Sequence, residues 1–418
     1  MSDASDIRPR LSPLIRAVDP YRPPRHPAPV DLRLDGNEGP APDQGVLDAV
    51  AAIGPEVLRS YPRPGDLERL LARRLGLDPE QVVVTAGADD AIERALRCVL
   101  GPGRELIVPA PAFEMIERYA ALTGCDVIRV PWLEGPFPAG EVLARVSERT
   151  AAIVVVTPSS PIGLTATAGD LERLSRNAPG ALLIVDLVYT ELADGDLTAA
   201  ALALPNAVVV RSLSKAWGLA GARVGYAAGP AEIVGWLRAV GHPYAVSAPS
   251  LAAARARLET GDDAVRAWAG RVREERGALG RLLAGLGAAV TPSQANFVLA
   301  RFADAAWVRD ALAGLGIAVR AFPGVADLEG ALRITLPGEE RVFARLCHAL
   351  EAALAPQALL FDMDDTLADA SRSYRGATIA TAAAFGVAIT LEDITRAKAA
   401  GDANDDWKLT WRMIREGG

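Results

Sequence analysis

Residues 212–226 read SLSKAWGLAGARVGY and directly follow an aliphatic run, NAVVVR (206–211). This run is one of seven short segments rich in Val and Ile that alternate with segments of helical periodicity, such as 66–76, 89–101 and 170–178. The other six are VVVT (82–85), ELIV (105–108), VIRV (127–130), AIVVV (152–156), ALLIV (181–185) and VGYAA (224–228). The alternation predicts an α/β fold in which helices cover both faces of a mostly parallel, seven-stranded sheet.

The pattern changes after residue 244, where a long stretch rich in Ala, Arg, Leu and Glu (251–286) is predicted to be helical. Strand-like and helical segments follow, as is typical of a small α+β domain. The first 50 residues are rich in proline and lack periodicity, which indicates an arm packed on the small domain. The predicted parts are this arm (1–50), a large αβα domain (51–244), a small α+β domain (245–355) and a C-terminal segment (356–418).

The composition excludes several classes of protein. Basic residues number 44 against 52 acidic ones, and the net charge of −8 offers no positive field for nucleic acid or an anionic membrane. The cysteines, Cys98, Cys125 and Cys347, are too few for a disulfide scaffold and lack metal-ligand spacing. No apolar run approaches the roughly 18 residues of a membrane span, so we expect a cytoplasmic protein.

Lysine is rare in this chain. It occurs only as Lys215, Lys398 and Lys408, and the other 41 of the 44 basic residues are arginine. Arginine replaces lysine wherever a positive charge suffices, but it does not lose its proton and attack a carbonyl group. Lys215 is therefore either a chance survivor of a compositional bias or a reactive amine, and its neighbours favour the reactive amine.

Lys215 lies just after a predicted strand, and open parallel sheets bind ligands beyond the carboxyl ends of their strands. An amine at that place suits pyridoxal 5′-phosphate (PLP), whose aldehyde it can hold as an imine. The hydroxyls of Ser212 and Ser214 and the guanidinium of Arg223 suit the phosphate of this cofactor. The alternative is a glycine-rich turn that carries a solvated lysine.

Two residues near the end of another strand suit the ring of the same cofactor. Asp186 ends the run ALLIVD, and Tyr189 follows three residues later. A buried carboxylate can keep the pyridine nitrogen protonated, and a phenol can donate to the ring oxygen O3′. Without Lys215, an ordinary capping aspartate and a core tyrosine would be the simpler interpretation.

A third segment, TAGADDAI (85–92), joins a strand to a helix. The backbone N–H groups of Gly87, Ala88 and Asp89 would face a phosphate at the helix N-terminus, although many strand-to-helix turns begin in this way. Phe113, after the next strand, is placed to stack on a flat ring, and its alternative is an ordinary core position.

Together these segments resemble the fold-type I PLP-dependent aminotransferases, most closely the histidinol-phosphate aminotransferase branch. The resemblance covers about residues 10–355. It rests on VDPYRPP (18–24), LDGNEGP (34–40), SYPRPG (60–65), TAGADDAI (85–92), PAPAFEM (109–115), PSSPIG (158–163), DLVY (186–189), SLSKAWGLAGARVGY (212–226), HPYAVS (242–247), SQANF (293–297) and LRITL (332–336).

The resemblance implies a role for each site residue. Lys215 would be the Schiff-base lysine and proton shuttle, Asp186 the partner of the pyridine nitrogen, and Tyr189 the donor to O3′. Arg333 would clamp the substrate α-carboxylate with help from Asn37, and Tyr21 and Arg320 would lie near the side-chain pocket. The residues implied to hold the phosphate are Ala88, Asp89, Ser212, Ser214 and Arg223, with Tyr61 contributed by the other subunit of a homodimer.

The chain departs from the family pattern at two positions. Ser160 replaces the asparagine that binds O3′, and Leu187 replaces an acidic residue after the aspartate. We expect amino transfer between an L-amino acid, or an amine derived from one, and a 2-oxo acid. The alternatives are a non-transaminating PLP enzyme, which decarboxylates, eliminates or replaces a group on a phosphorylated or sulfonium amino acid, and a silent scaffold protein.

The C-terminal segment carries a second motif. FDMDDTLAD (361–369) resembles motif I of the haloacid dehalogenase (HAD) hydrolases, in which Asp362 would be the nucleophile and Asp364 the acid or base. About 62 residues cannot close that fold. We therefore expect an incomplete, HAD-like segment that packs rather than catalyses.

Overall fold

The computed structural model describes residues 11–15, 20–21, 25–356, 374–401 and 405–417. The chain divides into two compact units, Met1–Ala355 and Pro356–Gly418. The described residues of the larger unit form two sheets.

The larger sheet has seven strands in the order β2-β8-β7-β6-β5-β3-β4. Strand β8 runs antiparallel to β2 and β7, and the other neighbours are parallel. The predicted fold class is therefore confirmed. The strands are β2 (Val82–Thr85), β3 (Glu105–Ala110), β4 (Asp126–Pro131), β5 (Thr150–Val156), β6 (Leu182–Asp186), β7 (Ala207–Ser212) and β8 (Gly225–Ala228).

The central strands are buried on both faces because alternate residues enter different cores. In β5, Val154 packs with one apolar cluster and Val155 with another. One cluster includes residues of α4 (Gly87–Val99), α5 (Glu114–Ala121) and α9 (Ala231–Val240). The other includes residues of α6 (Ala139–Leu143), α7 (Ala168–Asn177) and α8 (Thr198–Leu202). Buried aliphatic runs of this kind are the expected sequence of a doubly covered sheet.

The smaller sheet has the order β1-β11-β12-β10-β9. Its first strand, β1 (Leu32–Leu34), comes from the proline-rich N-terminal region and pairs in parallel with β11 (Ile317–Ala321). The other elements here are β9 (Ala289–Thr291), β10 (Phe297–Arg301), β12 (Ala331–Thr335), α12 (Ala305–Gly314) and α13 (Glu340–Leu354). The N-terminal region thus adds a strand that its proline content concealed.

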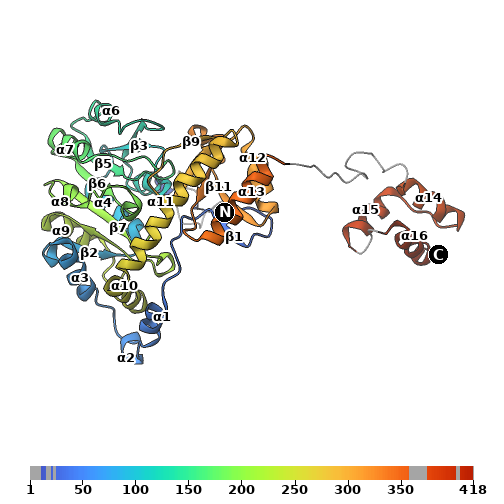
Figure 1. Cartoon of the computed structure of the whole chain (residues 1–418), viewed down its shortest axis with the longest axis horizontal. Helices are drawn as coiled ribbons and strands as arrows, with labels where there is room; N and C mark the ends of the chain where they lie inside the picture. The colour runs from blue at the N-terminus through green and yellow to red at the C-terminus, as the bar shows by residue number, and fades with distance from the viewer. Residues whose placement is uncertain (1–10, 16–19, 22–24, 357–373, 402–404, 418) are drawn as a thin grey trace, which may run out of the picture. The chain divides into compact units, whose positions relative to one another are not determined.

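The helical stretch expected over residues 251–286 is present, but it consists of two helices that meet at Gly261. They are α10 (Ala248–Thr260) and α11 (Asp262–Gly285). A side chain at Gly261 would lie 2.4 Å from the carbonyl oxygen of Arg257, and Asp262 and Asp263 suit the N-terminus of a new helix. Helix α11, the long yellow helix in Figure 1, packs against both the residue 190–192 turn and strands β9 and β10.

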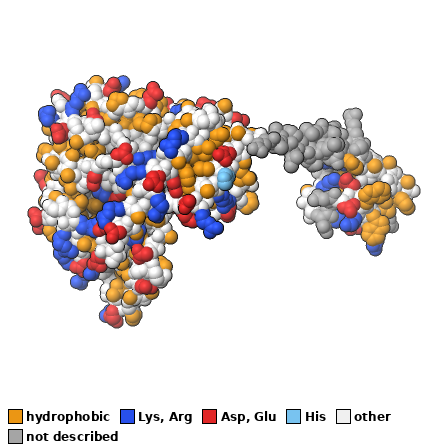
Figure 2. Space-filling view, in the orientation of Figure 1, with side chains coloured by type: hydrophobic (Ala, Val, Ile, Leu, Met, Phe, Trp, Pro, Cys, Tyr) orange, Lys and Arg blue, Asp and Glu red, His pale blue; other side chains and the backbone are white. Residues whose placement is uncertain are grey.

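Three helices lie between β1 and β2: α1 (Gln44–Ala51), α2 (Pro55–Leu58) and α3 (Gly65–Leu75). Helix α1 packs on α10. Figure 2 shows acidic and basic side chains interspersed on the visible face of the larger unit. Within the described ranges, no helix has the length and apolar character needed to cross a bilayer.

The described part of the smaller unit contains three helices, α14 (Tyr374–Ala384), α15 (Leu391–Ala399) and α16 (Asp406–Gly417). They share a small apolar core built from Ala382, Val387, Ile389, Ile394 and Leu409. Asp362 and Asp364, the acidic pair of the HAD-like motif, lie outside the described residues. The interpretation of that motif therefore stays a prediction.

Candidate active site

The candidate site lies beyond the carboxyl ends of β6 and β7. These two strands are parallel neighbours, so Asp186 at the end of β6 and Ser212 at the end of β7 reach the same edge of the sheet. A cavity of about 530 Å³ opens there. Its walls include Asn37, Phe113, Ser160, Tyr189, Lys215 and Arg333, which come from six separate segments of the chain.

The Lys215 amine points into this cavity. Its Nζ donates to the carbonyl oxygen of Gly36 at 3.3 Å and lies 5.6 Å from the centre of the Tyr189 ring. A side chain at Gly39 would clash with the Lys215 carbonyl oxygen, so the loop that contains Gly39 packs directly on the lysine backbone. No carboxylate of the described residues forms an ion pair with Lys215, which leaves its amine available for a ligand.

Asp186 is a buried carboxyl group at the same strand edge. Only 2% of the residue is exposed, and its Oδ1 accepts a hydrogen bond from the Val188 N–H at 3.1 Å. Burial raises the pKa of Asp186 to about 7, against the opposing effect of the positive Lys215. A carboxyl group in this state can share a proton with a basic ring nitrogen.

Contacts with Asn37 and Phe297 fix the side chain of Tyr189. Its phenol oxygen accepts from Asn37 Nδ2 at 3.0 Å, and its ring packs edge-on against Phe297. Burial opposes ionisation of the phenol, but the charges of Lys215 and Arg333 bring the pKa of Tyr189 below its ordinary value. A phenol of lowered pKa is a strong hydrogen-bond donor to a ring oxygen.

Asn37, which the resemblance assigns to help Arg333 with the α-carboxylate, lines the same cavity as Arg333 and contacts Tyr189. Its backbone is left-handed, with φ of 55°, and its side chain is fixed because Thr335 Oγ1 donates to Asn37 Oδ1 at 2.9 Å. The amide nitrogen is thereby aimed at the Tyr189 oxygen. A role for Asn37 in substrate binding stays a prediction.

The residues predicted to hold a phosphate gather at the start of α4. Gly87 has φ of +82°, and a side chain there would lie 2.8 Å from Arg223 Nη2. Arg223 donates to Asp89 Oδ2 at 2.9 Å and to Ser214 Oγ at 3.5 Å. The Ser214 N–H donates to Ser212 Oγ at 3.0 Å. Because no side chain caps α4, the first N–H groups of the helix, including that of Ala88, suit a phosphate.

The phosphate-binding residues lie close to the ring-binding residues. The negative charge of Asp89 adds to the burial that raises the pKa of Asp186, so the two carboxyl groups are electrostatic neighbours. Gly87, Ser212, Ser214 and Arg223 do not line the 530 Å³ cavity itself, which lies on the Lys215 side. The arrangement thus has two parts. One is an anion cradle, formed by Gly87, Ala88, Asp89, Ser212, Ser214 and Arg223, and the other is the 530 Å³ cavity, which we call the chamber.

Arg333, on β12, lines that chamber and carries an unused donor. Its Nη2 donates to the Asp35 carbonyl oxygen at 2.9 Å and its Nη1 to Ser160 Oγ at 3.3 Å. Its buried Nε has no partner among the described residues, and no carboxylate there forms an ion pair with the guanidinium. A buried cation with a spare donor is the group expected to bind a carboxylate.

The remaining predicted residues lie in two places. Tyr21, Phe113 and Arg320 line the chamber. Tyr61 does not belong to the described wall of this chamber; it is 75% exposed and its ring stacks on that of Tyr244 at 4.4 Å.

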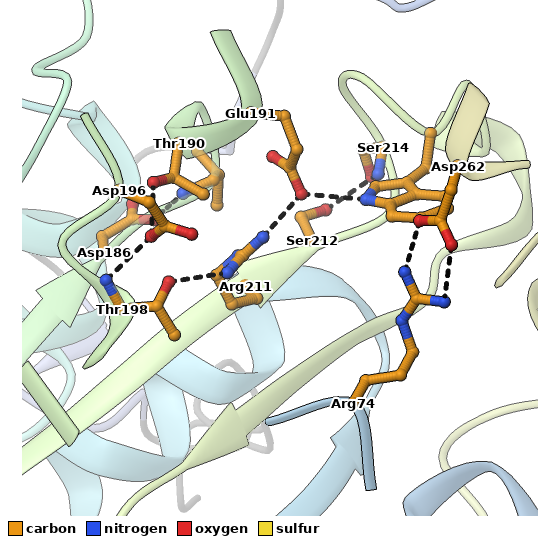
Figure 3. Close-up of polar contacts among 12 residues, drawn as sticks. Arg74, Asp186, Thr190, Glu191, Asp196, Thr198, Arg211, Ser212, Ser214 and Asp262 are labelled. Atoms are coloured by element: carbon orange, nitrogen blue, oxygen red, sulfur yellow. Dashed lines mark hydrogen bonds and ion pairs between the residues drawn. The ribbon is translucent and has the colours of Figure 1, made fainter. Parts of the chain in front are cut away.

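Sequence reasoning missed a polar network beneath the Lys215 segment. Arg211 Nη2 donates to Glu191 Oε1 at 2.6 Å, and Arg211 Nη1 donates to Thr198 Oγ1 at 2.8 Å (Figure 3). Trp217 Nε1 donates to the same Glu191 oxygen at 2.8 Å. Glu191 therefore ties the turn after Tyr189 to the turn after Lys215. The one sequence signal was an arginine at the end of an otherwise aliphatic strand.

Comparison with known proteins identifies the family. The model of the family described as aminotransferase class I and II matches residues 36–350, about three quarters of the chain. The chain belongs to this family. It is a PLP-dependent aminotransferase that acts on amino acids and oxo acids.

Relatives of this aminotransferase support the assignment. A histidinol-phosphate aminotransferase of Roseiflexus castenholzii is 35% identical over 343 residues, 76% of this chain and 92% of that protein. One from Ruegeria pomeroyi is 32% identical over 321 residues, 74% of this chain and 87% of that protein.

Solved structures agree with the fold. Histidinol-phosphate aminotransferase from Sinorhizobium meliloti, in complex with PLP, has a TM-score of 0.75 and 26% identity, covering 84% of this aminotransferase and 100% of that chain. An aspartate aminotransferase from Thermus thermophilus has a TM-score of 0.68 at 22% identity, covering 82% of this chain and 100% of that one, and shows the shared fold.

Proposed function

We propose that this enzyme moves an amino group between an L-amino acid, or an amine derived from one, and a 2-oxo acid through Lys215. The observation that carries the proposal is the Lys215 amine, which lies in the chamber near Tyr189 without a carboxylate partner among the described residues. Its charge acts on both Asp186 and Tyr189. The Lys215 amine is thus close enough to affect the pKa of both groups that would contact the cofactor ring.

The side chains divide the work of holding the cofactor. PLP, when bound, supplies an aldehyde that joins amines and a ring that accepts electrons from the substrate Cα. Asp186 would hold a proton at the ring nitrogen, and Tyr189 would donate to the ring oxygen. The phosphate would be bound by the N–H groups at the start of α4, with Ser212, Ser214 and Arg223.

Substrate binding and proton transfer fall to two further groups. Arg333 would bind the α-carboxylate with its spare donor, which fixes the substrate beside Lys215. Lys215, once free of the cofactor, would take the proton from Cα and return it at C4′. Ser160 Oγ accepts from Arg333 Nη1 at 3.3 Å, and the hydrogen bond between the Ser160 and Tyr189 side chains helps to lower the pKa of Tyr189. The ring oxygen would therefore rely on Tyr189.

We also propose that the active form is a homodimer in which Tyr61 reaches the cofactor phosphate of the neighbouring subunit. Two observations support this. Tyr61 is 75% exposed and lies outside the chamber of its own chain. Val57 and Leu58, just before it, are also exposed apolar residues, as expected of a surface that a second copy covers.

The test of Lys215 uses the scarcity of lysine in this chain. Borohydride reduction of the PLP-loaded protein fixes the cofactor on the lysine that holds it, and peptide mass spectrometry then locates the label. We expect the label on Lys215 and the loss of visible absorbance in Lys215→Ala, whereas Lys398→Ala stays yellow. A label on Lys398 or Lys408, with Lys215 unmodified, would contradict the proposal.

A further inference from the structure

A second arginine lies beside Arg333 on the neighbouring strand. Arg320 and Arg333 are directly opposite each other in the register of β11 and β12, and both line the chamber. Arg333 has a spare donor, as described above. Arg320 instead donates from Nη2 to Glu114 Oε1 at 3.0 Å. The two neighbouring arginines therefore differ. Arg320 is paired with a carboxylate, and Arg333 has no carboxylate partner among the described residues.

The Glu114 carboxylate is well placed to leave this pair. Glu114 is the first residue of α5, and its side chain is 45% exposed, whereas that of Arg320 is 12% exposed. Phe322 lies beneath the Arg320 guanidinium, 5.8 Å from its ring centre, and keeps the cation in place. A half-exposed carboxylate is weakly held, so an anion that arrives in the chamber can replace it at a fixed arginine.

An aminotransferase must bind two chemically different substrates in one site, one after the other. We propose that Glu114 is a specificity-determining residue: it is the exchangeable counter-ion of Arg320, released when a substrate brings an anionic side-chain group and retained when the side chain is neutral. The inference rests on the proposed function of Arg333 as the α-carboxylate site. No covalent bond forms or breaks, because one carboxylate or phosphate replaces another at the guanidinium.

The chain offers a matched control on the same helix. Glu117 lies one turn after Glu114 and also lines the chamber, but it pairs with Arg129, whose Nε donates to Glu117 Oε1 at 2.9 Å. Glu114→Gln and Glu117→Gln each remove one negative charge from the chamber. Glu114→Gln frees Arg320, whereas Glu117→Gln frees Arg129, which also lines the chamber. The comparison therefore separates exchange at Arg320 from a change of chamber charge or the release of another arginine.

The kinetic test compares L-glutamate with its neutral isostere L-glutamine as amino donors to the PLP-loaded enzyme. We expect Glu114→Gln to raise the ratio of kcat/KM for glutamate over glutamine about fivefold, since a half-exposed ion pair no longer competes. Glu117→Gln should leave this ratio unchanged. Arg320→Gln should lower the ratio about tenfold by removing the receiving cation.

A binding measurement makes the test independent of turnover. Calorimetry on the PLP-loaded enzyme should show about fivefold tighter binding of glutarate to Glu114→Gln, with no change for the half-amide of glutarate. An unchanged ratio and unchanged glutarate affinity, or equal effects of Glu114→Gln and Glu117→Gln, would overturn the inference. If no donor transfers an amino group yet glutarate binding responds as expected, the proposed function fails and the role of Glu114 stands.

Discussion

At the scale of single residues, the site depends on charged groups whose surroundings set their state. Lys215 lacks a carboxylate partner among the described residues, Asp186 is buried with a pKa of about 7, and Arg333 has a spare buried donor. Each state suits a ligand group of complementary chemistry. Substitutions that change these states should therefore alter ligand binding or stability directly.

The first prediction concerns Arg333. Arg333→Lys keeps a positive charge but loses the planar pair of donors that matches a carboxylate. We expect kcat/KM to fall about a hundredfold for every amino donor, while the visible absorbance of the bound cofactor is retained. Steady-state kinetics and an absorbance spectrum check both parts, and a loss restricted to acidic donors would argue against α-carboxylate binding.

The second prediction concerns the pH dependence of stability. Asp186 has a pKa of about 7 in the folded protein, above its ordinary value of 3.8. Between these values the folded protein holds a proton that the unfolded chain releases, so the free energy of unfolding falls as the pH rises through this window. Asp186→Asn removes this dependence because the amide is neutral throughout.

Thermal unfolding of protein prepared without PLP tests this. The Tm of Asp186→Asn minus the Tm of the native sequence should be larger at about pH 8 than at about pH 5. An equal excess at both pH values would show that Asp186 ionises like an exposed aspartate.

At the scale of elements, the strand-to-helix junction before α4 determines the anion cradle. Gly87 has a positive φ, and the Arg223 guanidinium occupies the space where a side chain would lie. We expect Gly87→Ala to weaken PLP binding about tenfold, because it strains the turn and displaces Arg223. Fluorescence titration with PLP measures the change.

Gly103→Ala is the matched control for this substitution. Gly103 has φ of +81° with open space where a side chain would lie, so its replacement adds similar backbone strain without touching Arg223. If both variants lose the same affinity for PLP, the contact between Gly87 and Arg223 has no special role.

Sequence patterns predicted the elements of the large sheet well. All seven aliphatic runs are strands, since a buried parallel strand requires Val and Ile on both faces. Short elements were missed, among them β1 and β9, because three residues carry too little periodicity. The break at Gly261 was not predicted, because a single glycine is a weak stop signal inside a helical stretch. A side chain at this position would crowd the Arg257 carbonyl oxygen.

The same limit applies to the candidate site. Lys215, Asp186 and Tyr189 follow aliphatic strands, so their common location followed from the sheet pattern. The contact of Asn37 with Tyr189 and the Arg320–Glu114 pair join residues 152 and 206 positions apart, and no local pattern encodes them. The Glu191 network has the same origin, since its members come from three separate segments.

At the scale of the whole molecule, the proposed homodimer predicts complementation between defective subunits. Lys215→Ala and Tyr61→Ala should each be inactive alone. In a mixed dimer, one site combines Lys215 of one chain with Tyr61 of the other, so refolding the two together should restore about a quarter of the native activity.

The control mixes Lys215→Ala with Asp186→Ala. Both residues serve the cofactor of their own chain, so every site in such a dimer lacks one of them and no activity should return. If this pair recovers as well as the first, or the first pair does not recover, Tyr61 does not act across an interface.

Amino transfer through this chamber is tested most directly by a single-turnover absorbance measurement on the PLP-loaded enzyme with a panel of L-amino acids. At least one donor should convert the visible band of the cofactor to the shorter-wavelength band of its pyridoxamine form, and a 2-oxo acid should restore the original band. Persistence of the visible band with every donor, together with release of carbon dioxide or of a side-chain leaving group, would contradict the account.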